Sequence, residues 1–224
     1  MATQNSILVI VTGHDRLPNQ HKTGLWFEEY AIPARLFRQH DFSVTVASLS
    51  GGATPIDPAS LHGQSDDREA LTALENTHKL NELKLADFDA VFFPGGHGAM
   101  FDLADSAEIG SAVAEFLQSG RIVGAVCHGP AALVAAKYPD GTAVVKNRKL
   151  TGFSNKEEQA AQLDSQMPFL LQDRLEELGA QVITADNWQD HTITDGNLIT
   201  GQNPQSSAST AMAFIHAIHK QLIN

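Results

Sequence analysis

Three short runs of the chain, residues 7–11, 90–93 and 122–126, are apolar at every position instead of at every second one. A strand that is apolar on both sides belongs in a sheet that is covered on both faces, which is typical of parallel sheets. Segments with helical spacing of apolar residues, at 26–39 and 106–119, lie between these runs. The alternation predicts an α/β fold with a doubly wound, mostly parallel sheet flanked by helices.

The remaining elements are predicted from the same patterns. We expect strands at 42–47 and 181–184, and helices at 71–85, 131–137 and 170–178. A hairpin is expected around Asp195-Gly196-Asn197, followed by a last helix that runs to about Leu222, with Asn203 as its N-cap and Pro204 in its first turn. The whole chain, 1–224, reads as a single domain with an insertion near 50–85.

Charge and cysteine content exclude several classes of protein. The formal net charge is -11 and the sequence pI is near 5.2, so nucleic acid and anionic membranes are unsuitable partners. No apolar stretch is long enough to span a bilayer. The single cysteine excludes an internal disulfide, and the run 7–11 is too short for the core of a signal peptide. We therefore expect a cytoplasmic protein.

The single cysteine, Cys127, follows the apolar run 122–126 directly, and His128, Gly129 and Pro130 come after it. Ligand sites in α/β sheets lie at the carboxyl ends of strands, and a following helix would favour the thiolate through its dipole. A lone cysteine is often only a small core residue, but a core cysteine needs no His-Gly-Pro after it. We expect a nucleophile elbow, with Cys127 partly exposed in a cleft and in a backbone conformation uncommon for a non-glycine residue.

Pro94-Gly95-Gly96-His97-Gly98 also follows an apolar run. Its backbone N–H groups could hold an oxyanion, although Gly-Gly alone more often marks a turn. The spacing is not that of a dinucleotide-binding motif. Ten histidines invite a metal interpretation, but no closed set of ligands stands out in the sequence, and we expect no metal.

The sequence also has two pairs of adjacent carboxylates, Glu28-Glu29 and Glu157-Glu158, whose roles the residue pattern does not decide. Such pairs usually form a solvated helix face, and the residues alone give no reason to assign a role to either member of a pair.

The motifs of the chain resemble, as a set, those of the ThiJ/PfpI superfamily, whose fold is that of the class I glutamine amidotransferases. They are K-T-G-L-W-F-E-E at 22–29, F-F-P-G-G-H-G at 92–98, A-V-C-H-G-P at 125–130, L-T-G-F-S-N-K-E-E at 150–158 and I-T-D-G-N-L-I-T-G-Q-N-P at 193–204. The first and fourth motifs are most similar to the branch of heat-inducible, glutathione-independent glyoxalases (glyoxalase III) and chaperones.

The resemblance implies a flavodoxin-like sandwich and a set of site residues. Cys127 would be the nucleophile, His128 its partner and Glu158 the third member of a Cys-His-Glu triad. Glu29 would be a buried glutamate that touches the cysteine. Gly96, with its neighbours Gly95 and His97, and the His128 N–H would form the oxyanion and substrate-binding site.

The function implied is the conversion of a small 2-oxoaldehyde, such as methylglyoxal, to a 2-hydroxy acid through a Cys127 hemithioacetal. This chemistry needs a soft nucleophile, an acid/base and an oxyanion site, and no cofactor. The resemblance also implies a homodimer. Two alternatives stay open: a cysteine-dependent amide hydrolase, which needs nearly the same residues, and a non-enzymatic stress chaperone or redox sensor.

Overall fold

The computed structural model describes residues 5–61 and 67–223 and is built around a sheet of seven strands in the order β3-β2-β1-β4-β5-β9-β8. These strands are β1 (Ser6–Ile10), β2 (Ser43–Ser48), β3 (His78–Lys79), β4 (Ala90–Phe93), β5 (Ile122–Val126), β8 (Thr192–Asp195) and β9 (Leu198–Gly201). All neighbours are parallel except the β8–β9 hairpin. The predicted fold class and the hairpin are confirmed.

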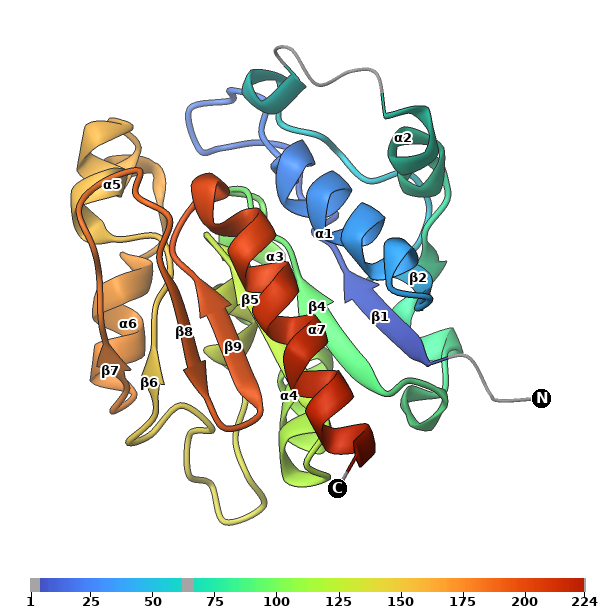
Figure 1. Ribbon diagram of the computed structural model, residues 1–224. Helices are drawn as coiled ribbons and strands as arrows, with labels where there is room; N and C mark the ends of the chain where they lie inside the picture. The colour runs from blue at the N-terminus through green and yellow to red at the C-terminus, as the bar shows by residue number, and fades with distance from the viewer. Residues whose placement is uncertain (1–4, 62–66, 224) are drawn as a thin grey trace.

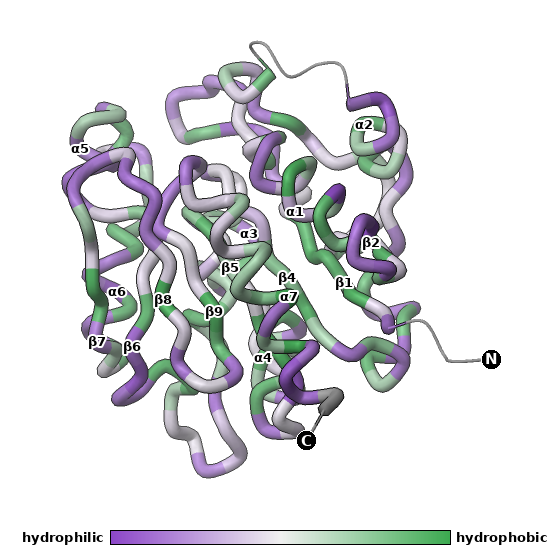
Figure 2. The backbone as a smooth tube through the Cα atoms, in the orientation of Figure 1, coloured by the Kyte–Doolittle hydropathy of each residue, from purple (hydrophilic) through white to green (hydrophobic). Residues whose placement is uncertain are grey.

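Helices cover both faces of this sheet (Figure 1). Helices α1 (Phe27–Gln39) and α7 (Ser207–Ile223) lie together on one face, and α3 (Ala99–Asp102) and α4 (Ala107–Gln118) lie on the other. The continuous apolar runs of β1 and β4 form the centre of the molecule, as their green colour in Figure 2 shows. Apolar side chains therefore point into a core on each side.

A two-stranded parallel sheet of β6 (Lys149–Leu150) and β7 (Gln181–Val182) lies beside the main sheet, with α5 (Asn155–Ala160) and α6 (Leu171–Glu177). The predicted strand at 181–184 is thus shorter than expected and pairs outside the main sheet. Neither β6 nor α5 was predicted. Within the two described ranges no helix combines the length and the apolarity needed to cross a membrane.

The predicted helix at 71–85 is wrong in its second half. Helix α2 (Arg68–Glu75) begins at the Asp67 side chain, which accepts a hydrogen bond from Ala70 N, and it ends before Thr77. The Thr77 backbone exchanges two hydrogen bonds with Gly52, and β3 then pairs with β2. Edge pairing to the main sheet therefore replaces the helix, and the insertion near 50–85 supplies an edge strand. Residues 62–66 of that insertion lie outside the described part.

Two other expectations fail at helix starts. The segment predicted as a helix at 131–137 forms only a short 3-10 helix, Gly129–Leu133. The last helix is preceded by a 3-10 turn, Pro204–Ser206, and the Asn203 side chain caps neither. Its amide donates instead to the Glu157 carboxyl and to the Gln189 carbonyl, each at 2.8 Å.

Candidate active site

Cys127 lies directly after β5, where the chain turns sharply away from the sheet. Its φ is +60°, a left-handed conformation that costs a non-glycine residue about 1–3 kcal/mol. Two backbone hydrogen bonds hold it there: its N–H donates to the Gly201 carbonyl at 3.0 Å, and its carbonyl accepts from Phe153 N–H at 2.8 Å. Gly129 completes the turn, since a Cβ there would stand 2.1 Å from the Phe93 carbonyl oxygen. The expected backbone conformation is confirmed.

The expected partial exposure of Cys127 is wrong, because only 3% of the residue is accessible. It nevertheless lines a cavity of about 330 Å³. Trp26, Phe153 and Trp188 line the same cavity, so the sulfur faces a largely apolar hollow.

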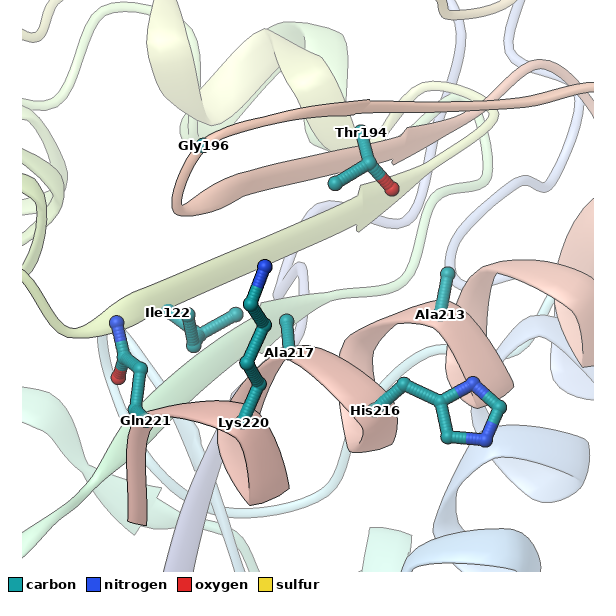
Figure 3. A pocket seen from close by; sticks show the side chains of 8 residues that line it. All are labelled: Ile122, Thr194, Gly196, Ala213, His216, Ala217, Lys220 and Gln221. Atoms are coloured by element: carbon teal, nitrogen blue, oxygen red, sulfur yellow. The ribbon is translucent and has the colours of Figure 1, made fainter. Parts of the chain in front are cut away.

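A larger hollow of about 510 Å³ lies between α7 and the β8–β9 hairpin (Figure 3). His216 and Lys220 are its titratable lining residues, and among residues 5–61 and 67–223 no cysteine or carboxylate lines it. It holds neither the nucleophile nor an acid to support one. Cys127, His97 and His128 line the smaller cavity, which is therefore the candidate site.

His128 stands between the sulfur and a carboxylate. Its Nδ1 lies 3.5 Å from the Cys127 sulfur, and its Nε2 lies 2.7 Å from Glu158 Oε2. The Phe153 ring packs on the imidazole, with centroids 4.4 Å apart. A carboxylate only accepts hydrogen bonds, so the proton is on Nε2 and the lone pair of Nδ1 faces the sulfur. Glu158 thus reaches His128 as expected.

The adjacent carboxylate, Glu157, has a different position. It closes a capping box with Ser154 at the start of α5 and also accepts hydrogen bonds from Trp188 N–H and the amides of Gln202 and Asn203. This buried anion is held entirely by neutral donors. It fixes the first turn of α5, which orients Glu158, and the segment that carries Trp188.

Glu29 lies in the first turn of α1 and is fully buried. Its Oε2 accepts a hydrogen bond from Gly95 N–H at 2.8 Å, its Oε1 is buried and has no hydrogen-bond partner among the described residues, and the carboxyl is close enough to the Cys127 side chain for each group to shift the pKa of the other. The neighbouring Glu28 lines the cavity instead. Since Gly95 N–H serves Glu29, it is not free to hold an oxyanion.

The sulfur and the Glu29 carboxyl share one site that disfavours two charges. Burial raises the pKa of the Cys127 thiol well above its ordinary value, and the Glu29 carboxyl raises it further, while the N–H groups of Gly96 and His128 lower it in part. Burial likewise raises the pKa of Glu29 well above the ordinary range. The interaction with Cys127 lowers the pKa of Glu29 in part, so the two groups share one proton and the pair titrates as a unit.

The expectation that a helix dipole lowers the pKa of the thiol is wrong. Only a 3-10 helix of five residues follows Cys127, which is too short for a macrodipole of useful size. The Gly96 and His128 N–H groups, which were expected to form the oxyanion site, point at the sulfur and are the groups that support its charge.

The His128–Glu158 pair is fixed in its charge state by its surroundings. Burial lowers the pKa of His128 and the nearby His97 lowers it further, which outweighs the opposing effect of Glu158. Burial alone would raise the pKa of Glu158, but hydrogen bonds and charge interactions with His128 and His97 together bring it well below the usual range. A neutral base and an ionised carboxylate result.

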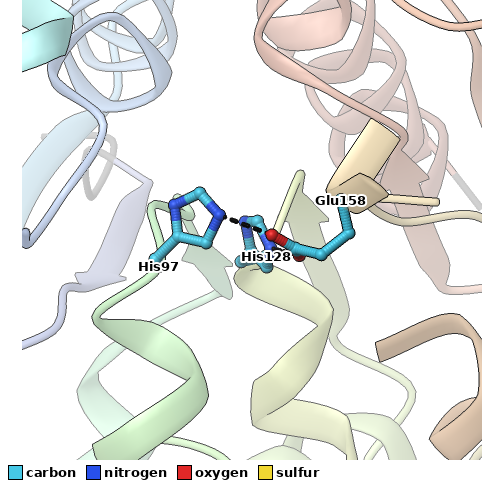
Figure 4. A group of neighbouring side chains, drawn as sticks. All are labelled: His97, His128 and Glu158. Carbon is cyan, nitrogen blue, oxygen red and sulfur yellow. Dashed lines mark hydrogen bonds and ion pairs between the residues drawn. The ribbon is translucent and has the colours of Figure 1, made fainter. Parts of the chain in front are cut away.

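His97 was expected at the oxyanion site, and the structure places it against the triad carboxylate instead. Its Nε2 lies 2.8 Å from Glu158 Oε1, and its ring centroid is 4.2 Å from that of His128 (Figure 4). The histidine in the G-G-H-G motif was the only sequence signal for this contact. Its pairing with a carboxylate 61 residues away was not predictable from spacing.

The three groups drawn in Figure 4 have ligand atoms within 4.8 Å of one another, as a metal site would require. Two ligands of one tetrahedral zinc stand about 3.3 Å apart, given metal–ligand distances of about 2.0–2.1 Å. The observed N–O contacts of 2.7 and 2.8 Å are shorter than that and match hydrogen bonds. A metal could bind here only after displacing both protons.

The loop before α1 closes the cavity by docking on the Gly95-Gly96 turn. Trp26 N–H donates to the Gly95 carbonyl at 3.1 Å, and Gly98 N–H donates to the Gly24 carbonyl at 3.4 Å. A Cβ on Gly96, whose φ is +97°, would stand 2.2 Å from the Gly24 carbonyl oxygen. Gly24, in the motif at 22–29, and Gly96, in the motif at 92–98, thus form a close backbone contact between the two loops. A nucleophile and a neutral base that line one cavity, with a buried carboxyl behind the nucleophile, form the active site of an enzyme.

Comparisons with known proteins agree with this architecture. Residues 24–221 match the DJ-1/PfpI family. A glutathione-independent glyoxalase of Schizosaccharomyces pombe is 31% identical over 90% of this chain and 91% of its own. The Rapid Encystment Protein of 24 kDa from Francisella tularensis superposes with a TM-score of 0.91 at 34% identity, over 96% of this chain and 99% of its own. Glyoxalase III from Candida albicans has a TM-score of 0.86 at 27% identity, over 96% and 97% of the two chains. The chain is a member of the DJ-1/PfpI family.

Proposed function

We propose that this protein is a glutathione-independent glyoxalase, which converts 2-oxoaldehydes such as methylglyoxal to 2-hydroxy acids. The observation that carries the proposal is the buried Glu29 carboxyl next to the Cys127 side chain, where each group shifts the pKa of the other. An amide hydrolase needs a nucleophile, a base and an acid, but not a second carboxyl against its nucleophile. An isomerisation that moves hydrogen between two carbons does need an acid/base close to the carbon that bonds to the sulfur, and a carboxyl can fill that role.

The proton of the Cys127–Glu29 pair accounts for the first step. The sulfur attacks the aldehyde carbon (C1), and the proton shared with Glu29 passes to the aldehyde oxygen (O1), which gives a neutral hemithioacetal. Glu29 is then ionised beside C1 and can remove the hydrogen of that carbon. It returns the hydrogen to the ketone carbon (C2), and the product is the thioester of a 2-hydroxy acid.

His128 accounts for the last step. Its Nδ1 lone pair can take a proton from a water that attacks the thioester, and the thiolate leaves. The sulfur and Glu29 regain their shared proton from His128, and the 2-hydroxy acid leaves as an anion. The oxidation state of the substrate as a whole does not change, so this proposal includes no cofactor. It also retains the expectations of a homodimer and a cytoplasmic location.

The test is the incubation of the purified protein with methylglyoxal in the absence of glutathione, followed by detection of lactate by NMR. We expect catalytic formation of lactate, and Cys127→Ala should lower turnover by at least about 10³-fold. Release of ammonia from glutamine or cleavage of peptides, without formation of lactate, would favour the hydrolase instead. Suppression of the aggregation of a client protein that persists in Cys127→Ala, without either activity, would favour the chaperone.

A further inference from the structure

His97 and His128 hold the two oxygens of a single carboxylate. Glu158 Oε1 accepts from His97 Nε2 at 2.8 Å, and Oε2 accepts from His128 Nε2 at 2.7 Å (Figure 4). A Cys-His-Glu triad uses one imidazole only. The second imidazole is therefore not explained by the activation of the sulfur.

The hydrogen bonds to Glu158 fix the tautomer of both rings. Since the carboxylate can only accept, each Nε2 carries a hydrogen, and in a neutral ring the lone pair is then on Nδ1. The Nδ1 of His128 faces the Cys127 sulfur at 3.5 Å. The Nδ1 of His97 makes no hydrogen bond to residues 5–61 or 67–223. It is also not one of the buried side-chain atoms of those residues that lack a partner, so this nitrogen is accessible to solvent.

His97 also lines the cavity that holds the nucleophile. Its ring lies beside that of His128, with centroids 4.2 Å apart. A substrate bonded to the Cys127 sulfur through C1 would extend past His128 into this cavity, so C2 and its oxygen would lie farther from the sulfur than C1 does. An unpaired nitrogen base thus stands at the wall of the space that the second carbon would occupy.

We propose that His97 is a second acid/base of this site, which moves a hydroxyl proton from O1 to the oxygen on C2 (O2) while Glu29 moves hydrogen from C1 to C2. The inference rests on the proposed glyoxalase function and assigns it one more catalytic residue. After Glu29 has removed the C1 hydrogen, the substrate is an enediolate with a hydroxyl at O1 and a charge at O2.

The proton transfer from O1 to O2 completes the isomerisation. The Nδ1 of His97 takes the proton from O1 and delivers it to O2, so that the charge moves to O1. A C1=O1 bond forms as C2 accepts the hydrogen from Glu29, and the thioester with a hydroxyl at C2 results. No redox partner is needed. During the transfer, Glu158 faces the imidazolium, as a carboxylate does in a triad.

The assignment also explains why one histidine does not serve both steps. His128 lies next to the sulfur and is the residue placed to return a proton when the thiolate leaves. Burial and the neighbouring His97 both lower the pKa of His128, so a proton on one ring opposes a second proton on the other. Two imidazoles on one carboxylate can act in turn without both becoming charged.

The experiment compares His97→Gln with the wild type, because glutamine can still donate to Glu158 but cannot titrate. Three quantities are measured: formation of lactate from methylglyoxal, the rate at which iodoacetamide alkylates Cys127, and the amount of methylglyoxal adduct on the protein by mass spectrometry. We expect turnover to fall by about 10²- to 10⁴-fold. Alkylation should stay within about threefold, and the adduct should accumulate. His78→Gln, at an exposed histidine on β3, is the matched control and should behave as the wild type.

Each other outcome contradicts the proposal in a different way. Turnover of His97→Gln within about threefold of the wild type would show that His97 carries no proton. A parallel fall in alkylation and turnover would show that His97 only positions Glu158. If the wild type itself forms no 2-hydroxy acid, the glyoxalase function is wrong and the role of His97 in it is wrong as well.

Discussion

The proton between Cys127 and Glu29 decides what the sulfur can do. A neutral thiol beside an ionised carboxyl would be a poor nucleophile, whereas a thiolate beside a protonated carboxyl is a good one with its acid already in place. Burial raises the pKa of both groups. Two N–H groups, of Gly96 and His128, face the sulfur, and one, of Gly95, faces the carboxyl. The N–H groups favour the charge on the sulfur, whereas the interaction between the two side chains raises the pKa of Cys127 and lowers that of Glu29.

The variant Glu29→Gln separates these two states. Glutamine is neutral and can donate a hydrogen bond to sulfur, as a protonated glutamate does. We therefore expect the apparent pKa of Cys127, measured from thiolate absorbance against pH, to change by less than about one unit. Turnover should fall by about 10²- to 10⁴-fold, because the carbon-to-carbon shuttle is lost.

Two results would contradict this view of Glu29. A large drop in the pKa of Cys127 in the glutamine variant would mean that Glu29 is ionised in the wild type. Unchanged turnover would mean that another group moves the hydrogen, and Glu28, which also lines the cavity, is the matched second variant to test.

Among the elements near the site, α5 depends most on a single buried anion. Glu157 accepts hydrogen bonds from the Ser154 backbone and hydroxyl, from Trp188 N–H and from two side-chain amides. Removing it would leave these buried donors without an acceptor, at about 1–3 kcal/mol for each donor that finds no water. We expect Glu157→Ala to lower the free energy of unfolding by roughly 3–5 kcal/mol in a urea titration.

The control for that variant is Glu177→Ala on α6. Glu177 is exposed and forms only a surface ion pair with Arg174 at 2.9 Å, so the loss should stay below about 1 kcal/mol. A similar small loss in Glu157→Ala would show that the amides rearrange without cost and that α5 does not depend on this carboxylate.

The walls of the cavity predict a preference among 2-oxoaldehydes. Methylglyoxal is small for a cavity of about 330 Å³ lined by Trp26, Phe153 and Trp188. Filling such space with apolar groups contributes about 1–3 kcal/mol. We expect kcat/KM for phenylglyoxal to exceed that for methylglyoxal by roughly tenfold or more, as followed by loss of the aldehyde.

Trp188 provides the structural test of that preference, since its side chain lines the cavity and is 41% exposed. Trp188→Ala should reduce the advantage of phenylglyoxal by about tenfold and leave methylglyoxal within about threefold. Ile183→Ala, at another exposed apolar residue, is the control. An equal loss on both substrates would mean that Trp188 supports the site and does not select the substrate.

The sequence predicted elements well where local pattern and tertiary environment agree. The runs at 90–93 and 122–126 became β4 and β5 because their continuous apolar character suits a buried strand only. The helix at 71–85 failed because Thr77 and His78 find strand partners in Gly52 and Ala47, which no local pattern reveals. The helix after Cys127 failed in the same way, since Gly129–Leu133 is held in a tight turn beneath the nucleophile.

At the scale of the whole molecule, the site joins segments that the chain keeps far apart. Cys127 and His128 follow β5, His97 follows β4, Glu29 begins α1 and Glu158 lies in α5. Motif resemblance pointed to all five of these residues, with His97 in a different role, whereas their contacts depend on the sheet order, which places β4 beside β5. The pairing of His97 with Glu158 and the burial of Cys127 depend on packing, so they could be found only in three dimensions.

Burying these groups also makes the stability of the fold depend on pH. The folded-state pKa of Glu29 is raised above its ordinary value of 4.5, so between these two values the folded chain binds more protons than the unfolded chain. Its contribution to stability is fully present below 4.5 and is lost as the pH rises through the raised pKa. The pKa values of Glu158 and His128 are lowered, so their contributions are lost as the pH falls.

Glu29→Gln removes the pH dependence of stability that comes from Glu29 and leaves those that come from Glu158 and His128. Relative to the wild type, the variant should become more stable as the pH rises above about 5, with a limiting slope of about 1.4 kcal/mol per pH unit while Glu29 is ionised in the unfolded chain and still protonated in the folded chain. Urea unfolding of both proteins at several pH values measures the difference. Glu75→Gln, on exposed α2 surface, controls for the exchange of glutamate for glutamine itself. A constant difference between Glu29→Gln and the wild type across this range would show that Glu29 ionises at the same pH in the folded and unfolded chains. In that case it could not hold the proton on which the reaction at Cys127 depends.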